Sequence, residues 1–107
     1  MTNPRLAVIL QALRQELLRA LGPRLVQVVL FGSQTRGDAW LDSDIDVLVV
    51  VQGEVDHADL RQRTSEGVAR ICLEHDVVIS RFFASAAHYH QAPTAFLRTI
   101  RREGVPA

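Results

Sequence analysis

The stretch LVQVVLFGSQTRGDAWLDSDIDVLVVV, residues 25–51, carries the strongest structural pattern in the chain. Residues 25–31 are mostly apolar, rich in valine and followed by a glycine, which predicts a buried strand. Residues 44–51 are apolar except for two aspartates near their start, and they predict a central strand of a sheet. The segment between these strands has about a dozen residues, which is short for a helical crossover. We therefore expect a mixed sheet rather than a purely parallel one.

Helical patterns flank both strands. Leucines recur at helical spacing from Leu6 to Leu21, after a Thr-Asn-Pro start signal and before Gly22-Pro23. Residues 56–75 also predict a helix, although Gly67 interrupts it at a cost of about 1 kcal/mol relative to alanine.

The C-terminal part of the chain predicts one more strand and one more helix. We expect the strand over residues 76–82, then a loop that holds His88 and His90, and a helix from Pro93 to near Gly104. The fold class is therefore α/β (α+β): a single domain over residues 1–107, with a small mixed β-sheet of about three strands and flanking helices.

The composition limits the binding partners and the cellular compartment that we expect for the protein. The chain has 107 residues and a formal net charge of zero, so its overall charge favours neither nucleic acid nor a membrane as partner. All the basic residues other than histidine are arginine, so cationic contacts to phosphate must come from guanidinium groups. Cys72 is the only cysteine, and there is no long apolar run or signal-peptide pattern. We expect a cytoplasmic protein that does not bind membranes.

Asp44 and Asp46 are the first candidates for chemistry. Strand side chains alternate between faces, so these two carboxylates point to the same side, about 6.5–7 Å apart along the chain. Two like charges drawn to 4 Å would repel by about 4 kcal/mol at an effective dielectric constant of 20. Such a pair needs a counter-charge, and Mg²⁺ suits because it binds carboxylates together with substrate phosphates.

Gly32 and Ser33 are candidates for phosphate binding. A glycine at the end of a strand allows close approach of a ligand, and the backbone amides that follow can donate to phosphate oxygens. Arg36 lies three residues further on and could neutralise phosphate charge, or it could pair with Asp38 or Asp42. Asp76 could complete a cluster of three carboxylates if neighbouring strands start in line, or it could be a capping residue.

These residues together resemble a known family. A Gly-Ser pair, ten intervening residues and Asp-x-Asp is the signature of the DNA polymerase β-like nucleotidyltransferase superfamily, and Gly32-Ser33 and Asp44-Ile45-Asp46 match that spacing. The surrounding residues resemble the minimal nucleotidyltransferase (MNT) branch, whose members are found beside HEPN-domain proteins in toxin–antitoxin pairs. The resemblance extends to the strand near Asp76 and to the last helix, which ends in Glu-Gly-Val.

The resemblance implies a role for each matched residue. Asp44 and Asp46 would be catalytic metal ligands, with Asp76 as the third carboxylate that activates the acceptor hydroxyl. Gly32, Ser33 and Arg36 would bind the nucleotide. The expected cofactor is Mg²⁺, as two ions that stabilise the attacking and leaving oxygens, and the expected substrate is ATP.

The expected function is transfer of NMP, in particular AMP from ATP, to an acceptor on a HEPN-domain partner, which makes the chain an MNT-type antitoxin. The alternative is a non-catalytic antitoxin that neutralises its partner by contact, since 107 residues leave no separate acceptor-binding domain. An antibiotic-modifying adenylyltransferase is a third candidate, disfavoured for the same reason. Self-association is plausible for such a small apolar domain, whereas direct nucleic-acid binding is not expected.

Overall fold

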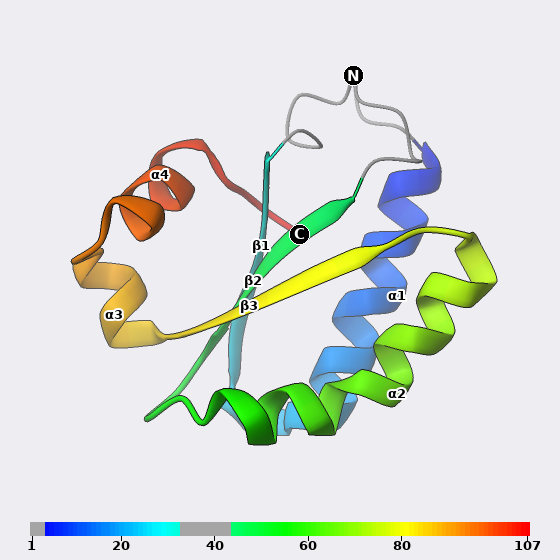
Figure 1. Ribbon diagram of the computed structural model, residues 1–107, viewed down its shortest axis with the longest axis horizontal. Coiled ribbons are helices and arrows are strands. Elements are labelled where there is room, and N and C mark those ends of the chain that lie inside the picture. Colours follow the sequence, from blue (N-terminus) through cyan, green and yellow to red (C-terminus); the bar gives the residue numbers. More distant parts are fainter. Residues whose placement is uncertain (1–3, 33–43) are drawn as a thin grey trace.

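The computed structural model describes residues 4–32 and 44–107, which form one sheet with helices on both faces (Figure 1). The elements in chain order are helix α1 (Pro4–Leu21), 3-10 helix η1 (Gly22–Arg24), strands β1 (Leu25–Phe31) and β2 (Ile45–Val51), helix α2 (His57–His75), strand β3 (Ile79–Ser85), helices α3 (Ala86–Gln91) and α4 (Ala95–Glu103), and strand β4 (Val105–Pro106). In this part of the chain, no helix combines the length and apolar character needed to span a bilayer.

The sheet is mixed, as the short connection between the first two strands predicted. Its order is β3-β2-β1-β4, with β1 antiparallel to both β2 and β4, and β2 parallel to β3. The fourth strand was not predicted, because it has only two residues and one of them is Pro106. Proline is compatible with this position because β4 is an edge strand.

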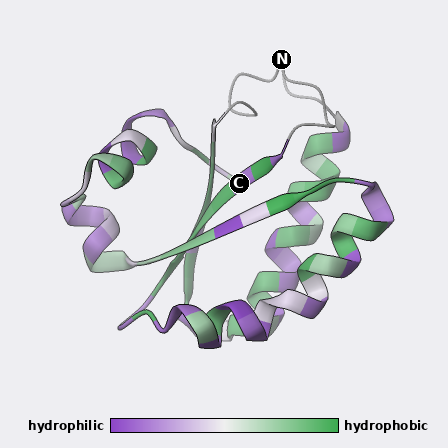
Figure 2. Cartoon of the chain, viewed as in Figure 1, coloured by the Kyte–Doolittle hydropathy of each residue, from purple (hydrophilic) through white to green (hydrophobic). Residues whose placement is uncertain are grey.

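Each face of the sheet has its own hydrophobic core. Successive side chains of β2 point to opposite faces of the sheet and so enter different cores. Ile45 and Val47 pack under α1 and α2, whereas Leu48 and Val50 pack under α3 and α4. The strands are accordingly coloured as hydrophobic over most of their length (Figure 2). A strand buried on both faces explains the nearly continuous apolar run in the sequence.

Gly67 allows helices α1 and α2 to approach each other. A Cβ atom at this position would lie 2.2 Å from Cγ of Glu16 on α1, so any larger residue would displace that side chain. Glu16 in turn pairs with Arg19 and, at 2.9 Å, with Arg70 of α2. The helix-propensity cost expected from the sequence is therefore offset by close packing between the helices.

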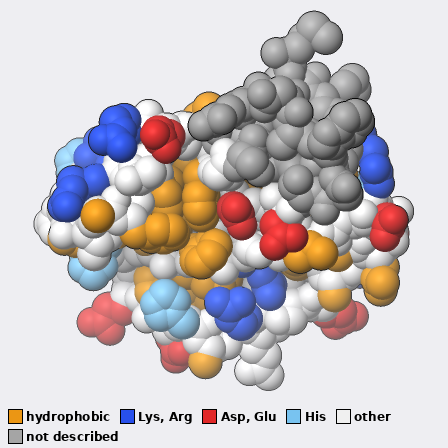
Figure 3. Space-filling model, turned by 45° about the horizontal axis from the view of Figure 1, so that its top comes forward, with side chains coloured by type: hydrophobic (Ala, Val, Ile, Leu, Met, Phe, Trp, Pro, Cys, Tyr) orange, Lys and Arg blue, Asp and Glu red, His pale blue; other side chains and the backbone are white. Residues whose placement is uncertain are grey.

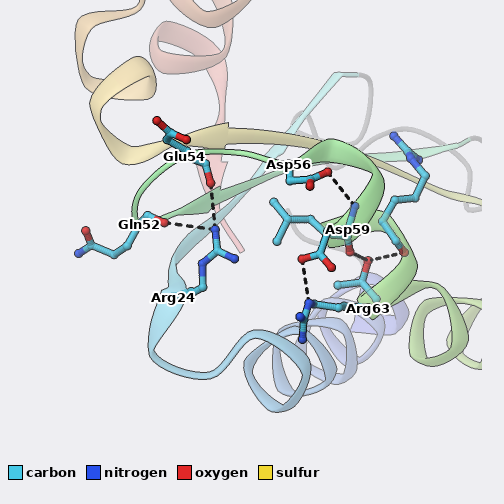
Figure 4. A network of polar contacts seen from close by, with 9 residues as sticks. Arg24, Gln52, Glu54, Asp56, Asp59 and Arg63 are labelled. Carbon is cyan, nitrogen blue, oxygen red and sulfur yellow. Dashed lines mark hydrogen bonds and ion pairs between the residues drawn. The ribbon is translucent and has the colours of Figure 1, made fainter.

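Polar contacts organise the connection between β2 and α2 (Figure 4). The Arg24 guanidinium donates to the backbone carbonyls of Gln52, at 3.5 Å, and Glu54, at 3.0 Å. Asp56 caps helix α2 by accepting a hydrogen bond from the backbone N–H of Asp59 at 3.1 Å. These contacts stabilise the end of β2 that is remote from its aspartates.

The prediction of a strand over residues 76–82 was wrong by three residues, since β3 begins at Ile79. Asp76 instead ends helix α2 in the left-handed conformation, with φ of 54°, and its backbone N–H donates to the carbonyl of Cys72. Aspartate tolerates this conformation better than most residues, which makes it a suitable helix terminator. Asp76 and Asp44 therefore do not open neighbouring strands in line.

The loop predicted around His88 and His90 is helix α3. Its first turn is capped by Ser85, whose hydroxyl accepts a hydrogen bond from the backbone N–H of His88 at 3.1 Å. A helix of six residues is too short to show apolar periodicity, so the sequence pattern could not reveal it.

Candidate functional site

The two aspartates of the sequence motif lie at the start of strand β2. Ile45 and Val47 are completely buried in the core under α1 and α2. Because strand residues alternate, Asp46 faces the opposite side of the sheet, and Asp44, directly before the strand, has the same parity. Asp46 is partly buried and Asp44 is exposed. Both carboxylates therefore lie on the same face of the sheet as α3 and α4. These helices cover that face only further along β2, over Leu48 and Val50.

Gly32 brings the end of β1 against this acidic pair. Phe31 is the β1 residue paired with Asp46, so Gly32 immediately follows the row that contains the carboxylate. Gly32 has φ of +80°, and a Cβ atom there would lie 2.7 Å from Oδ2 of Asp46. Only glycine combines this backbone conformation with such a close approach. The structure therefore brings Gly32 and Asp46 together, although they are far apart in the sequence.

The electrostatics of the pair favour a bound cation. Burial raises the pKa of the Asp46 carboxyl above its ordinary value, and the nearby Asp44 charge raises it further. None of the ion pairs formed within residues 4–32 and 44–107 involves either carboxylate. Two hard oxygen donors without a cationic partner from this part of the chain fit Mg²⁺, which commonly takes one or two carboxylates and completes its shell with water and phosphate.

The raised pKa of Asp46 gives a prediction for metal-free protein. Native protein binds the Asp46 proton more tightly than unfolded protein does, so this stabilisation is present below pH 3.8 and is lost as the pH rises through the raised pKa. Asp46→Asn lacks this component. Its free energy of unfolding in chelator-containing buffer should therefore increase relative to wild type from about pH 3.5 upward and then level off. The measurement is urea denaturation of both proteins at a series of pH values. If the difference between their free energies of unfolding does not change with pH, the pKa of Asp46 is not raised in the native protein.

Of the other predicted site residues, Ser33, Arg36 and Asp76, the structure describes only Asp76. Ser33 and Arg36 lie outside the described residues. Asp76 is exposed at the end of α2, and within the described ranges no three His, Cys, Asp or Glu side chains are grouped to hold a metal ion. The β3 residue paired with Asp46 is Ser80, which brings a hydroxyl rather than a carboxylate beside it.

Three phenylalanines next to the acidic pair were not predicted from the sequence. Phe31 of β1, Phe82 of β3 and Phe96 of α4 form an aromatic patch, with ring centroids 5.5–5.7 Å apart. Phe82 is 39% exposed and Phe96 is 47% exposed. Figure 3 shows hydrophobic side chains gathered on this side of the molecule, with acidic side chains beside them. No local sequence signal could have revealed the patch, because its members come from three separate elements.

Comparison with known proteins now identifies the class of protein. The profile of the family described as "Nucleotidyltransferase domain" matches residues 10–90, and this chain belongs to that family. The chain is a nucleotidyltransferase. A protein of Methanocaldococcus jannaschii, provisionally named protein adenylyltransferase MJ0141, is 29% identical over 97 residues, which are 91% of this chain and 93% of the relative.

Solved structures support the same fold. One is a toxin–antitoxin crystal structure with AMP-PNP; it aligns with a TM-score of 0.61 and 23% identity over 88% of this chain and 68% of the other. Another contains a tri-AMPylated HEPN toxin of Shewanella oneidensis in complex with an MNT antitoxin; it aligns with a TM-score of 0.53 and 19% identity over 92% of this chain and 70% of the other. At these identities the likeness establishes the fold. The family match confirms that the motif belongs to a nucleotidyltransferase domain.

Proposed function

We propose that this nucleotidyltransferase transfers AMP from ATP to a hydroxyl group of a HEPN-domain partner, and that it acts as an MNT-type antitoxin. The observation that carries the proposal is the close approach of Gly32 to the Asp46 carboxylate, which leaves no room for a Cβ atom, with Asp44 near Asp46. If Gly32 binds phosphate oxygens and the two carboxylates bind a cation, the two sites would adjoin, as transfer from a nucleoside triphosphate requires.

In the proposed reaction, the acceptor hydroxyl oxygen attacks the α-phosphorus of ATP. The new O–P bond forms while the bond from the α-phosphorus to the α,β-bridging oxygen breaks, and pyrophosphate leaves with that electron pair. Gly32 and Ser33 bind the triphosphate, and Arg36 neutralises part of its charge. The hydroxyl proton passes to a carboxylate, which the family resemblance assigns to Asp76. That assignment stays a prediction, since Asp76 lies three residues before β3 begins.

Asp44 and Asp46 would hold Mg²⁺. Bound there, magnesium would neutralise phosphate charge and polarise the α-phosphate toward attack. The protein contributes by fixing the Asp46 carboxylate beside Gly32, so that the triphosphate need not reorganise it. Two ions are expected from the resemblance, and water and phosphate oxygens would complete the ligand set that the two carboxylates begin.

The choice of acceptor rests on the relatives. The M. jannaschii relative is named as a protein adenylyltransferase, and the S. oneidensis complex contains an AMPylated HEPN toxin with its MNT antitoxin. Binding of ATP is supported by the toxin–antitoxin structure that contains AMP-PNP.

The test is incubation of the purified protein with α-³²P-ATP, Mg²⁺ and a HEPN-domain protein encoded beside it. We expect label on the HEPN protein, lost when a chelator is added and absent when γ-³²P-ATP is used. Mass spectrometry should show the added mass of AMP on a hydroxyl-bearing residue. If the partner carries no label although the protein binds ATP, AMP transfer to the partner is contradicted. Neutralisation of the partner by contact would then be the function.

A further inference from the structure

The aromatic patch of Phe31, Phe82 and Phe96 is partly exposed to solvent. Phe31 and Phe96 pack edge to face, at an interplanar angle of 86°, and Phe82 is tilted against both, at 57° and 58°. The three rings therefore form a small apolar cluster. Phe82 and Phe96 nonetheless leave more than a third of their surface open to solvent. Burial of apolar surface stabilises a folded protein, so these exposed rings forgo part of that stabilisation. Contiguous exposed apolar side chains commonly mark a binding site.

The position of the patch relative to Asp46 indicates what binds there. Phe31 is directly paired with Asp46, and Phe82 is paired with Leu48, the next residue of β2 on the same face. Two residues along a strand correspond to about 6.5–7 Å. The patch therefore begins beside the carboxylate and extends away from it along β2, toward α4.

Its chemistry fits a flat, uncharged ring system. Phenylalanine side chains offer π-faces and ring edges but no hydrogen-bonding atoms. Any nucleobase can stack on such a surface, because every base has a π-face. A nucleotide whose phosphates lie at Gly32 and Asp46 carries its base only one ribose away. A partner protein, by contrast, needs to bring only a hydroxyl to this place. Continuity with Asp46 thus favours the nucleobase as the occupant.

We propose that the aromatic patch binds the base of the nucleoside triphosphate and that Phe82 and Phe96 supply its exposed stacking surface. This inference rests on the proposed function, because it needs the phosphates to be bound beside Asp46. The patch selects for ring area rather than for a particular hydrogen-bonding edge. The enzyme therefore prefers purine to pyrimidine nucleotides and distinguishes adenine from guanine only weakly.

The test compares two ligands that share the phosphate site but not the base. Calorimetry with Mg²⁺ measures the affinity for inorganic triphosphate and for an ATP analogue with a methylene α,β-bridge, which cannot be transferred. We expect Phe82→Ala and Phe96→Ala each to lower the affinity for the analogue by about 5- to 150-fold, the range for loss of one base–aromatic stack. Affinity for inorganic triphosphate should not change. Leu73→Ala, at a residue 85% exposed on α2, is the control and should affect neither ligand.

Phe82→Leu keeps an apolar side chain on β3 and tests the role of the ring even if the alanine variant folds poorly. It should weaken the ATP analogue by about 2- to 10-fold and reduce the preference for purine over pyrimidine triphosphates. Unchanged affinity for the analogue in all three phenylalanine variants would overturn the inference, as would equal weakening of the analogue and inorganic triphosphate. If wild type binds triphosphate but gains nothing from the base, the inference fails and the proposed function stands. If wild type binds neither ligand, the proposed function itself fails.

Discussion

Asp46→Asn is expected to lower kcat/KM for AMP transfer by at least about 100-fold while the protein stays folded. Even outer partners of metal ligands commonly contribute 10- to 100-fold to metal affinity or activity, and Asp46 is proposed to be a direct ligand. Asparagine has nearly the same shape, so the contact with Gly32 is preserved while the negative charge is lost. The measurement is steady-state transfer of labelled AMP over a range of Mg²⁺ concentrations.

Matched substitutions separate loss of the metal ligand from loss of charge in general. Asp59→Asn removes an aspartate that pairs with Arg63 on α2, at 2.8 Å, far from the acidic pair in the sequence, and should leave activity near wild type. Asp76→Asn tests the third carboxylate: a loss comparable to that of Asp46→Asn would support its assigned role, and wild-type activity would remove it. If Asp46→Asn itself retains more than about a tenth of the activity, Asp46 is not a metal ligand.

The same substitutions decide between catalysis and contact as the basis of antitoxin action. In cells that express the HEPN partner, the double variant Asp44→Asn with Asp46→Asn should lose protection if AMP transfer is the mechanism. Protection that persists with the inactive double variant would show that binding is sufficient. Co-purification of the variant with its partner establishes that the complex still forms.

The central part of the fold was accessible from the sequence because its signals are local and strong. The valine-rich segments that became β1 and β2 are buried on both faces, β2 over most of its length and β1 over residues 28–30. Their glycine and aspartate boundaries mark where β1 ends and β2 begins. The leucine periodicity of α1 is likewise a local signal, and the helix predicted over residues 56–75 agrees closely with α2. In these segments, local propensity and tertiary burial favour the same structure.

Elsewhere the outcome depends on contacts that no local pattern contains. Asp76 could open a strand or close a helix, and the left-handed turn that follows His75 decides in favour of the helix end. Strand β4 forms only because Val105 meets Leu30 of β1, which is distant in the sequence. The aromatic patch is not foreseeable for the same reason, since Phe31 and Phe96 become neighbours only after the sheet and α4 are assembled.

Gly32→Ala is expected to reduce AMP transfer by about 100-fold or more, through displacement of Asp46. The added Cβ would lie 2.7 Å from Oδ2 of Asp46, so the carboxylate must move to accommodate it. A misplacement of about 1 Å at a catalytic group can cost about 100-fold in rate. The left-handed backbone adds strain of about 1–2 kcal/mol for a residue with a side chain, which affects stability as well.

Gly53→Ala is the matched control for that backbone strain. Gly53 has φ of +77°, almost the same as the +80° of Gly32, but no atom outside its immediate chain neighbours lies within 4 Å of its added Cβ. It should lose similar stability from strain and keep nearly full activity. Equal loss of activity in the two alanine variants would mean that strain, rather than contact with Asp46, explains the effect.

A double-mutant cycle tests the contact without any assay of activity. In an Asp46→Ala background the carboxylate is absent, and the nearest remaining atom of residue 46, its Cβ, lies at an ordinary 3.7 Å from the added Cβ. The stability cost of Gly32→Ala in that background should therefore fall to the cost of Gly53→Ala, because only backbone strain is left. Urea denaturation of the four proteins gives the coupling free energy. A coupling of zero would mean that Gly32 and Asp46 are not in contact, and the proposed neighbouring sites for phosphate and cation would lose their basis.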